Sequence, residues 1–444
     1  MQTVFLLLLS VIFIVLSTTR LKLHPLLALV FAALIFGLGT GMAFDTLITA
    51  INTGFGSTIG KIGLVILAGS IIGAFLEKSG GVFRIAEWLL NAIGKARVPA
   101  AMSIIGYIVS IPVFADSSFI ILAPLNRALS KRAGLSLACT VVALALGLTV
   151  SHNLVPPTPG PIAAAGILGA DLGMVILMGI PISLVVLVVA WLFAAKWANR
   201  IQIDPNPALS EADIQQTIQA APSVGKSILP ILIPLILIVF KTIAGLKSMP
   251  LGEGILVEGL SFVGEPVIAL LIGVLLAFLL PQKLEKDMLS PKGWVGKAVI
   301  DAAVIIAITG AGGAFGKTLQ SSDLVDLIGD SVKTANLGIF LPFILAAALK
   351  SAQGSSTVAL ITTASILAPM AAGLGFESEM SQALLVLAIG AGSMVVSHAN
   401  DSFFWVVTQM SDFDVRMGYR LISAGTGVLG TSAILVIWLV SLFV

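Results

Sequence analysis

Four short polar stretches interrupt the apolar runs of this sequence, and the first three contain Gly or Pro. The first, residues 112–119 (PVFADSSF), carries the carboxyl group of Asp116 and the hydroxyls of Ser117 and Ser118. The proline at its start favours a broken helix, which would present a carboxylate and free backbone groups to a cavity. Because burial penalises its charged form, Asp116 is a candidate for a reversible proton carrier, with the two serines as substrate ligands. The alternative is a helix cap at an interface.

The second stretch, residues 151–161 (SHNLVPPTPGP), cannot form a regular helix throughout, because four of its last six residues are prolines. Open chain at membrane depth is tolerated only where protein or water satisfies its carbonyl groups, and we expect this for residues 154–161. His152 and Asn153 lie at the entrance of the open segment. They are candidates for proton coupling and substrate binding, although a single buried His is equally often a satisfied core residue.

The third stretch, residues 350–369 (KSAQGSSTVALITTASILAP), follows the end of an apolar run. Lys350 supplies a positive charge at its start. The candidate substrate-binding residues that follow are Gln353, Gly354, Ser355, Ser356 and Thr357. The pattern predicts a hairpin tip, where helix amino ends and hydroxyls could hold a carboxylate and sugar hydroxyls. The alternative is a snorkelling lysine that precedes an ordinary Ser- and Thr-rich helix.

The fourth stretch, residues 397–405 (SHANDSFFW), places His398, Asn400 and Asp401 within four residues. We interpret it as a second wall of the same site. Asn400 is then a substrate ligand, and His398 and Asp401 are further proton-coupling candidates, while Trp405 is an interfacial anchor. If the stretch were an exposed loop, the cluster would carry no such function.

The composition decides which class of protein must position these residues. The chain has 444 residues, of which 58% are hydrophobic and 10% are charged, with a mean hydropathy of +1.09. A soluble globule of this size could not bury so much apolar surface, so the sequence predicts an integral membrane protein. A net charge of +2 excludes nucleic-acid binding through a broad basic face. The single cysteine, Cys139, has no metal-ligand spacing around it, and we expect neither a bound metal nor a cofactor.

Apolar runs of about 14–22 residues predict roughly 12 membrane-spanning segments. These segments begin near Val4, Pro25, Ile62, Ala100, Leu135, Met174, Ile228, Val267, Ala298, Leu337, Gln382 and Leu421. The first run lacks a basic start and a small-residue cleavage site, so it is predicted to be a retained helix and not a signal peptide. The expected fold is an all-α polytopic membrane protein of about 12–14 transmembrane helices, with broken helices or re-entrant hairpins where Gly and Pro interrupt the runs.

One long polar interruption, residues 196–226, divides the chain into two predicted transmembrane repeats, residues 1–195 and 227–444. This predicted cytoplasmic linker contains Asp204, Pro205, Pro207, Glu211 and Asp213. Three short matches recur in the same order about 240 residues apart: GAF at 73–75 and 313–315, DSS at 116–118 with GSS at 354–356, and SHN at 151–153 with SHAN at 397–400. They indicate an internal duplication.

Basic residues favour the cytoplasmic face of a membrane, which tests the topology. If Arg20 is inside and every run crosses once, the basic groups around Lys131 and Lys286 fall outside. One added crossing between Val113 and Lys131 returns both groups and the linker to the inside, and gives each half about seven segments. An odd number makes the halves inverted repeats, as in many secondary transporters. A re-entrant hairpin elsewhere is the alternative.

At these stretches, and over nearly its whole length, the sequence resembles the gluconate permease (GntP) family of bacterial sugar-acid and hydroxy-acid proton symporters. The resemblance lies in LEKSGGVFRIAEWL at 76–89, PVFADSSF at 112–119, SHNLVPPTPGP at 151–161, AQGSSTVA at 352–359 and SHANDSFFW at 397–405. It implies proton-driven uptake, across the bacterial inner membrane, of a small anionic or zwitterionic substrate such as gluconate. The partners so implied are substrate, proton and lipid, with a homo-oligomer as a further option.

The resemblance also implies roles. Asp116 matches the aspartate of the family's P-V-F-x-D pattern, and its protonation would admit the incoming anion. The carboxylate would then bind the hydroxyls of residues 355–357 near Lys350, while Asn153 and Asn400 take substrate hydroxyls. The chain departs from the family pattern at three positions: Thr158 replaces a His, Ala115 an aromatic residue, and Lys350 an Arg. These departures leave the exact substrate open.

Other functions rank below a symporter. The resemblance leaves a D-serine or other small-carboxylate carrier as an alternative, and composition does not distinguish proton from sodium coupling. A passive channel and a structural role are the remaining alternatives. Residues 310–318 (GAGGAFGKT) resemble a phosphate-binding loop, but five residues separate Gly310 from Gly316 where four are required. An intramembrane protease using Asp116 and Asp401 is remote, because neither lies in a GxGD setting. We therefore predict a transporter and not an enzyme.

Overall fold

The computed structural model describes residues 2–94, 97–205, 219–245, 254–322 and 337–444, and every regular element in these ranges is a helix. The all-helical, multi-pass architecture that the apolar runs predict is thereby confirmed. The linker residues Pro207, Glu211 and Asp213 lie outside the described residues.

The first half of the chain consists of helices separated by short turns. In chain order they are α1 (Gln2–Thr19), α2 (Pro25–Gly39), α3 (Phe44–Lys78), α4 (Gly81–Ile93), α5 (Val98–Val109), α6 (Ala115–Ala133), α7 (Leu137–Leu154), α8 (Pro159–Leu168), α9 (Leu172–Lys196) and η2 (Ala198–Arg200). The proline-rich segment breaks the helix over residues 155–158 only, which is shorter than predicted. Pro159 begins α8, because proline lacks only an N–H that the first helical turn leaves unpaired.

The second half has the same character. Its helices are α11 (Val224–Ala244), α12 (Ile255–Val263), α13 (Pro266–Ala277), η3 (Lys286–Leu289), α14 (Trp294–Gln320), α16 (Phe340–Gln353), α17 (Ser356–Leu367), η4 (Ala368–Met370), α18 (Glu379–Met394), α19 (Ser402–Met410), α20 (Val415–Gly418), η5 (Tyr419–Ser423) and α21 (Ala424–Ser441). Since α9 ends at Lys196 and α11 begins at Val224, the predicted boundaries at 195 and 227 fall close to helix ends. The domain division itself stays a prediction.

Fewer helices are long enough to cross a membrane than the roughly 12 expected runs. Among the described residues six helices pass by length and composition, and the α12–α13 pair, bent by 68°, makes up to seven. Several other runs form apolar helices of 10–17 residues, including α5, α16, α17 and α18. Such helices are shorter than the ~20 residues that a bilayer requires. α16 and α17 meet at a buried hairpin tip, and α18 ends where the helix is interrupted before α19.

The helices of the two halves pair in the same way. α5 packs on α7 as α16 packs on α18, and α7 packs on α9 as α18 packs on α21. The matched motifs occupy matched places, because residues 116–118 and 354–356 both begin the second helix of a hairpin. Residues 151–153 and 397–400 both lie at a helix break. The arrangement agrees with the predicted duplication.

The crossing predicted between Val113 and Lys131 coincides with α6, but α5 and α6 form a hairpin. α5 has 12 residues, or about 18 Å of helix, which is too short to span the hydrocarbon core. The turn that joins α5 to α6 is buried, with Ile111 and Val113 at 7% and 4% exposure. A hairpin that enters and leaves the membrane on the same side places the basic groups on the same side as two full crossings would. We therefore interpret α5–α6 as a re-entrant hairpin, and α16–α17 is its counterpart in the second half.

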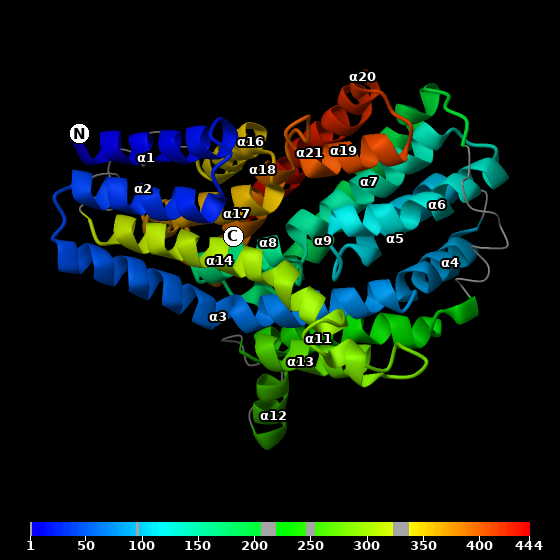
Figure 1. Cartoon of the computed structure of the whole chain (residues 1–444), viewed down its shortest axis with the longest axis horizontal. Coiled ribbons are helices and arrows are strands. Elements are labelled where there is room, and N and C mark those ends of the chain that lie inside the picture. The colour runs from blue at the N-terminus through cyan, green and yellow to red at the C-terminus, as the bar shows by residue number, and fades with distance from the viewer. Residues whose placement is uncertain (1, 95–96, 206–218, 246–253, 323–336) are drawn as a thin grey trace.

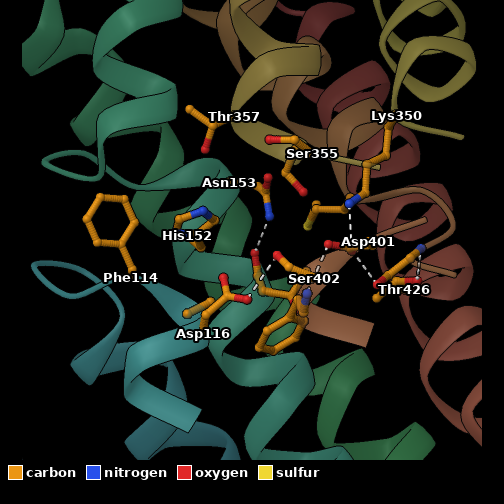
Figure 2. A pocket seen from close by; sticks show the side chains of 16 residues that line it. Phe114, Asp116, His152, Asn153, Lys350, Ser355, Thr357, Asp401, Ser402 and Thr426 are labelled. Carbon is orange, nitrogen blue, oxygen red and sulfur yellow. Dashed lines mark hydrogen bonds and ion pairs between the residues drawn. The ribbon is translucent and has the colours of Figure 1, made fainter. Parts of the chain in front are cut away.

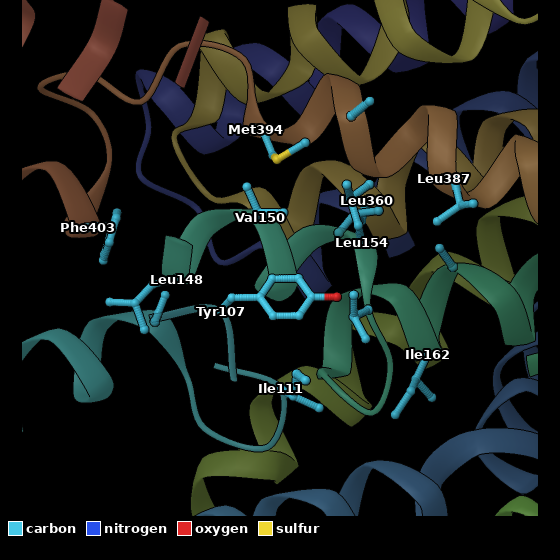
Figure 3. Close-up of a cluster of buried hydrophobic side chains, with 14 of the residues drawn as sticks. Tyr107, Ile111, Leu148, Val150, Leu154, Ile162, Leu360, Leu387, Met394 and Phe403 are labelled. Carbon is cyan, nitrogen blue, oxygen red and sulfur yellow. The ribbon is translucent and has the colours of Figure 1, made fainter. Parts of the chain in front are cut away.

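The two halves also interlock. α6 packs against α19 of the second half, and α17 packs against α8 of the first. Figure 1 places α1, α2 and the start of α3 at one end of the molecule and α4–α6 at the other, with α8 near the middle. The core gathers around α7, which is buried along almost its whole length. Figure 3 shows Leu148, Val150 and Leu154 of α7 among core residues of both halves.

Candidate functional site

A cavity of about 100 Å³ lies where both hairpins meet the end of α7 and the start of α19. Its lining comes from both halves: Phe114, Ala115, Asp116, Thr149, His152, Asn153, Lys350, Ser355, Ser356, Thr357, Met394, Ser397, Asp401, Ser402, Phe403 and Thr426. Figure 2 shows the polar side chains around this space. The volume holds several water molecules or a small polar solute.

Three helices direct their amino ends toward this cavity. The first residues of α6, α17 and α19 line it, and their N-cap residues are Phe114, Ser355 and Asp401. Ser355 and Asp401 each accept a backbone N–H of their own helix, whereas no side chain caps α6. Because the first turn of a helix presents unpaired N–H groups and a partial positive charge, the convergence of three such ends favours an anion.

Gly354 allows the second hairpin tip to approach the α18–α19 break. Its φ of +88° lies in the left-handed region and ends α16. A Cβ added at Gly354 would lie 2.1 Å from the carbonyl oxygen of Asn400. No other residue type could therefore hold this turn against the chain at residues 395–401.

Lys350 and Asp401 form an ion pair within the cavity lining, with Nζ and Oδ2 2.6 Å apart. Lys350 is 1% exposed and also donates to the carbonyl of Gly354. Asp401 accepts further hydrogen bonds from Ser397 Oγ and from the N–H of Phe403, at 2.5 and 3.1 Å. The charge of Lys350 is thus compensated by the protein, and it holds the hairpin tip to the start of α19.

Asp116 faces the cavity from the opposite hairpin. Its Oδ1 accepts a hydrogen bond from Ser402 Oγ, 3.2 Å away in the other half of the chain. Asp116 forms no ion pair with any residue that the structure describes. With Lys350 and Asp401 paired, the carboxylate of Asp116 is the uncompensated charge of the lining.

His152 and Asn153 occupy different settings although they are adjacent. His152 lines the cavity with its ring centroid 6.3 Å from that of Phe114, and its Nδ1 has no hydrogen-bond partner in the described structure. Asn153 donates to the carbonyl of Thr149 at 2.8 Å and accepts from Ser393 Oγ at 3.0 Å. Asn153 therefore bridges the two halves, while His152 keeps a free ring nitrogen.

Several predicted site residues lie outside the cavity lining. His398 and Asn400 both contact the carbonyl of Ser351, at 3.0 and 2.9 Å, and so hold the last turn of α16. Ser117 lines an adjoining small cavity beside Glu77 and Asp301. The remaining predicted residues off the lining are Ser118, Gln353 and Gly354.

Sequence reasoning did not single out several lining residues. Thr149 lies one turn before Asn153, so helical spacing could have identified it. Ser397 and Ser402 both lie within the fourth stretch, but they are not among its predicted site residues. Met394 and Thr426 carry no local signal, because the fold brings α18 and α21 to the cavity from distant parts of the chain.

The fold and the site together define a class. A polar cavity closed inside a multi-pass helical protein, at broken helices contributed by two related halves, is the arrangement of membrane transporters. Two solved transporters share the fold. The YdaH transporter of Alcanivorax borkumensis matches with a TM-score of 0.66 and 15% sequence identity, over 95% of this chain and 99% of that one. MtrF of Neisseria gonorrhoeae matches with a TM-score of 0.68 and 14% sequence identity, over 95% of this chain and 96% of that one.

The sequence comparisons give the family. Residues 2–443 match the profile of the GntP family permeases, and the chain belongs to this family. Its relatives include a gluconate permease of Pseudomonas aeruginosa, 34% identical over 98% of this chain and 96% of the relative. A high-affinity gluconate transporter of Escherichia coli is 32% identical over 92% of each chain. An uncharacterized permease of Haemophilus influenzae is 36% identical over 91% of this chain and 85% of the relative. The protein is a multi-pass permease of the bacterial inner membrane.

Proposed function

We propose that this permease couples the inward movement of protons to the uptake of gluconate or a related small sugar acid or hydroxy acid. The observation that carries the proposal is the cavity in which three helix amino ends, several hydroxyls and the uncompensated carboxylate of Asp116 converge. The gluconate transport named for two relatives supports the choice of substrate.

The amino end of α17 is the best place for the substrate carboxylate. Ser356 and Thr357 are the first residues of that helix and line the cavity, so backbone N–H groups and hydroxyls are available together. His152, Thr149 and Ser402 line the rest of the space and offer groups for substrate hydroxyls. Lys350 acts indirectly, because its charge is committed to Asp401.

The charges of the lining explain why a proton would accompany an anion. Two carboxylates, of Asp116 and Asp401, face one ammonium group, of Lys350, so the side chains of the deprotonated cavity carry one excess negative charge, which offsets much of the positive charge that the three helix amino ends supply. An anionic substrate would be repelled by this excess. Protonation of Asp116 removes it, so substrate and proton each favour the binding of the other.

Movement of the hairpin tips would then open the cavity to one side at a time. Both tips contact the cavity, and the second is held to the α18–α19 break through Gly354 and the Lys350–Asp401 pair. In transporters built from repeats, alternating access usually arises when one repeat moves as a rigid body against the other.

Transport by the purified protein in proteoliposomes tests the proposal. Counterflow should be measured with gluconate, other sugar acids, hydroxy acids and D-serine, and uptake repeated with a pH gradient, a sodium gradient or neither. We expect gluconate or a close relative to exchange, and a pH gradient alone to drive its accumulation. Exchange of D-serine alone would change the substrate class, and accumulation driven only by sodium would contradict proton coupling.

A further inference from the structure

A second and larger cavity, of about 350 Å³, lies between α3 and α14 where α8 and α17 end. Two lysines line it from facing helices, Lys61 on α3 and Lys317 on α14. Thr53, Ser57 and Thr58 add hydroxyls. None of the lining residues that the structure describes is acidic, so the cavity combines two cationic side chains with neutral donors.

The glycine-rich segment 310–318 lies inside α14, contributes Gly313, Gly316 and Lys317 to the cavity lining, and does not form a phosphate loop. A Cβ added at Gly54 would lie 2.4 Å from the carbonyl oxygen of Gly313, and one added at Gly313 would lie 2.0 Å from Thr58 Oγ1. These glycines let α3 and α14 pack closely, as small residues do between membrane helices. The close packing brings Lys61 and Lys317 to the same space.

The two lysines lack anionic partners in the described structure. Lys61 forms no ion pair, and Lys317 donates to Gln320 Oε1, a neutral acceptor, at 3.0 Å. Lys61 also lines a neighbouring cavity of about 280 Å³ together with Asp171 and Glu265, but there Asp171 caps α9 and Glu265 pairs with Lys241 at 2.6 Å. The carboxyl ends of α8 and α17 each contribute roughly half a negative charge, which leaves the cavity about one positive charge in excess.

The matching helix ends in the other half of the protein, those of α6 and α19, are bridged by a side chain. The offset of 238 residues that aligns Asp116 with Gly354 also aligns Arg127 of α6 with Ser365 of α17. Arg127 closes the carboxyl end of α19, with Nη2 2.7 Å from the Met410 carbonyl and Nη1 2.8 Å from Asp412. Ser365, at the matching position of α17, donates to the Ile361 carbonyl of its own helix at 2.7 Å, and this end of α17 borders the cavity.

We propose that this cavity is a second binding site for a small carboxylate, held between Lys61 and Lys317. α17 begins at the central cavity, which Ser356 and Thr357 line, and ends at this second cavity about 18 Å away. A carboxylate at this site therefore occupies a vestibule for the central cavity. The identity of the carboxylate as the transported sugar acid rests on the proposed function. An anionic lipid headgroup shares the chemistry, and the test separates the two.

Lysine protection in the wild-type chain tests the site without requiring transport. The protein in phosphatidylcholine nanodiscs is treated with a small amine-reactive acylating reagent, and mass spectrometry follows modification of Lys61, Lys317 and Lys78. At ten times the half-protecting concentration, sodium gluconate should slow modification of Lys61 and Lys317 about tenfold. Lys78, at the other end of α3, is the internal control and should be unaffected, as should all three with glucose in place of gluconate.

The outcomes distinguish a sugar acid from an anionic lipid headgroup as the occupant of the site. Equal modification with and without gluconate would overturn the proposal. Protection by phosphatidylglycerol nanodiscs in the absence of gluconate, with none from gluconate itself, would assign the site to lipid and also overturn it. Protection that persists in Ser356→Ala/Thr357→Val, a variant of the central cavity, would show that gluconate acts at the vestibule directly, and loss of protection in that variant would contradict it.

Transport by Lys61→Gln/Lys317→Gln gives a second measurement. We expect its KM for gluconate to rise about tenfold, through loss of two charge-assisted contacts, with kcat within twofold of wild type. Lys78→Gln, the matched control, should leave KM unchanged. If wild type exchanges gluconate and the double variant keeps its KM, the vestibule site is wrong while the proposed function stands. If wild type exchanges no carboxylate, the proposed function fails, and lysine protection still decides the site.

Discussion

The ammonium group of Lys350 lies 2.6 Å from the carboxylate of Asp401, and both side chains are buried. The pair joins the last turn of α16 to the first turn of α19 across the tip of the second hairpin. Lys350 therefore fixes the position of the hydroxyl-bearing end of α17 while its own charge is already neutralised. Changes to this pair should therefore alter the stability of the protein around the cavity.

Asp401→Asn should destabilise the protein, because it leaves Lys350 charged and unpaired in the interior. Breaking a buried ion pair typically costs about 3–5 kcal/mol. The Tm of the detergent-solubilised protein, followed by intrinsic fluorescence, should fall clearly below that of wild type. Lys350→Met/Asp401→Leu removes both charges and should regain part of the lost Tm. A double variant no more stable than Asp401→Asn would contradict the assignment of the pair.

Asp116→Asn should retain exchange but lose accumulation. The amide imitates the protonated carboxyl, so the substrate anion can bind without a proton. Counterflow of gluconate in proteoliposomes should remain measurable, while uptake driven by a pH gradient should fall to the level of equilibration. Asp45→Asn, in the first turn of α3 and outside the cavity lining, is the matched control. Full accumulation by Asp116→Asn would remove Asp116 from the coupling mechanism.

Gly354→Ala should abolish transport, because its Cβ would collide with the carbonyl oxygen of Asn400. Gly375→Ala offers a matched comparison, since Gly375 also has a positive φ, of +90°, but has no atom within 4 Å of an added Cβ. Backbone strain alone, about 1–2 kcal/mol, is common to both variants. Initial rates of gluconate uptake should be near wild type for Gly375→Ala. Equal rates in the two variants would show that the close approach at Gly354 has no functional role.

Cysteines placed at Lys131 and Lys196 should react from the same side of the inner membrane. Both positions are exposed in the structure, one at the end of α6 and one at the end of α9, and basic groups favour the cytoplasmic side. The native Cys139 is buried and gives little background. An impermeant maleimide should label both cysteines in inside-out vesicles and neither in intact spheroplasts. Labelling of the two positions from opposite faces would contradict the inverted topology.

The sequence predicts the candidate site because polar groups are costly inside apolar runs. Asp116, Lys350 and the hydroxyls of residues 355–357 were chosen on that ground, and the structure gathers them in one cavity. The same reasoning predicts a hairpin tip at residues 350–369 but only a broken helix at residues 112–119, since run length alone does not distinguish a short buried helix from a short crossing. This is why roughly 12 expected segments correspond to six or seven spans.

Pairing across the chain could not be predicted in the same way. His398 and Asn400 are polar and close to Asp401 in sequence, yet they contact the Ser351 carbonyl and not the cavity. The direction of these side chains depends on how the α18–α19 break meets α16, which only the packing decides. Thr426 reaches the lining from α21 by the same kind of tertiary contact.

The hydrogen bond between Asp116 and Ser402 joins residues 286 positions apart, and it has a consequence for synthesis of the chain. A ribosome adds about 5–20 residues per second, so roughly 15–60 s pass between the emergence of these two side chains. The tip of the first hairpin, with its carboxyl group, must wait that long for α19. The membrane insertion machinery or water has to shelter it meanwhile, and a chain released early would expose an unfinished polar cavity to the quality-control proteases.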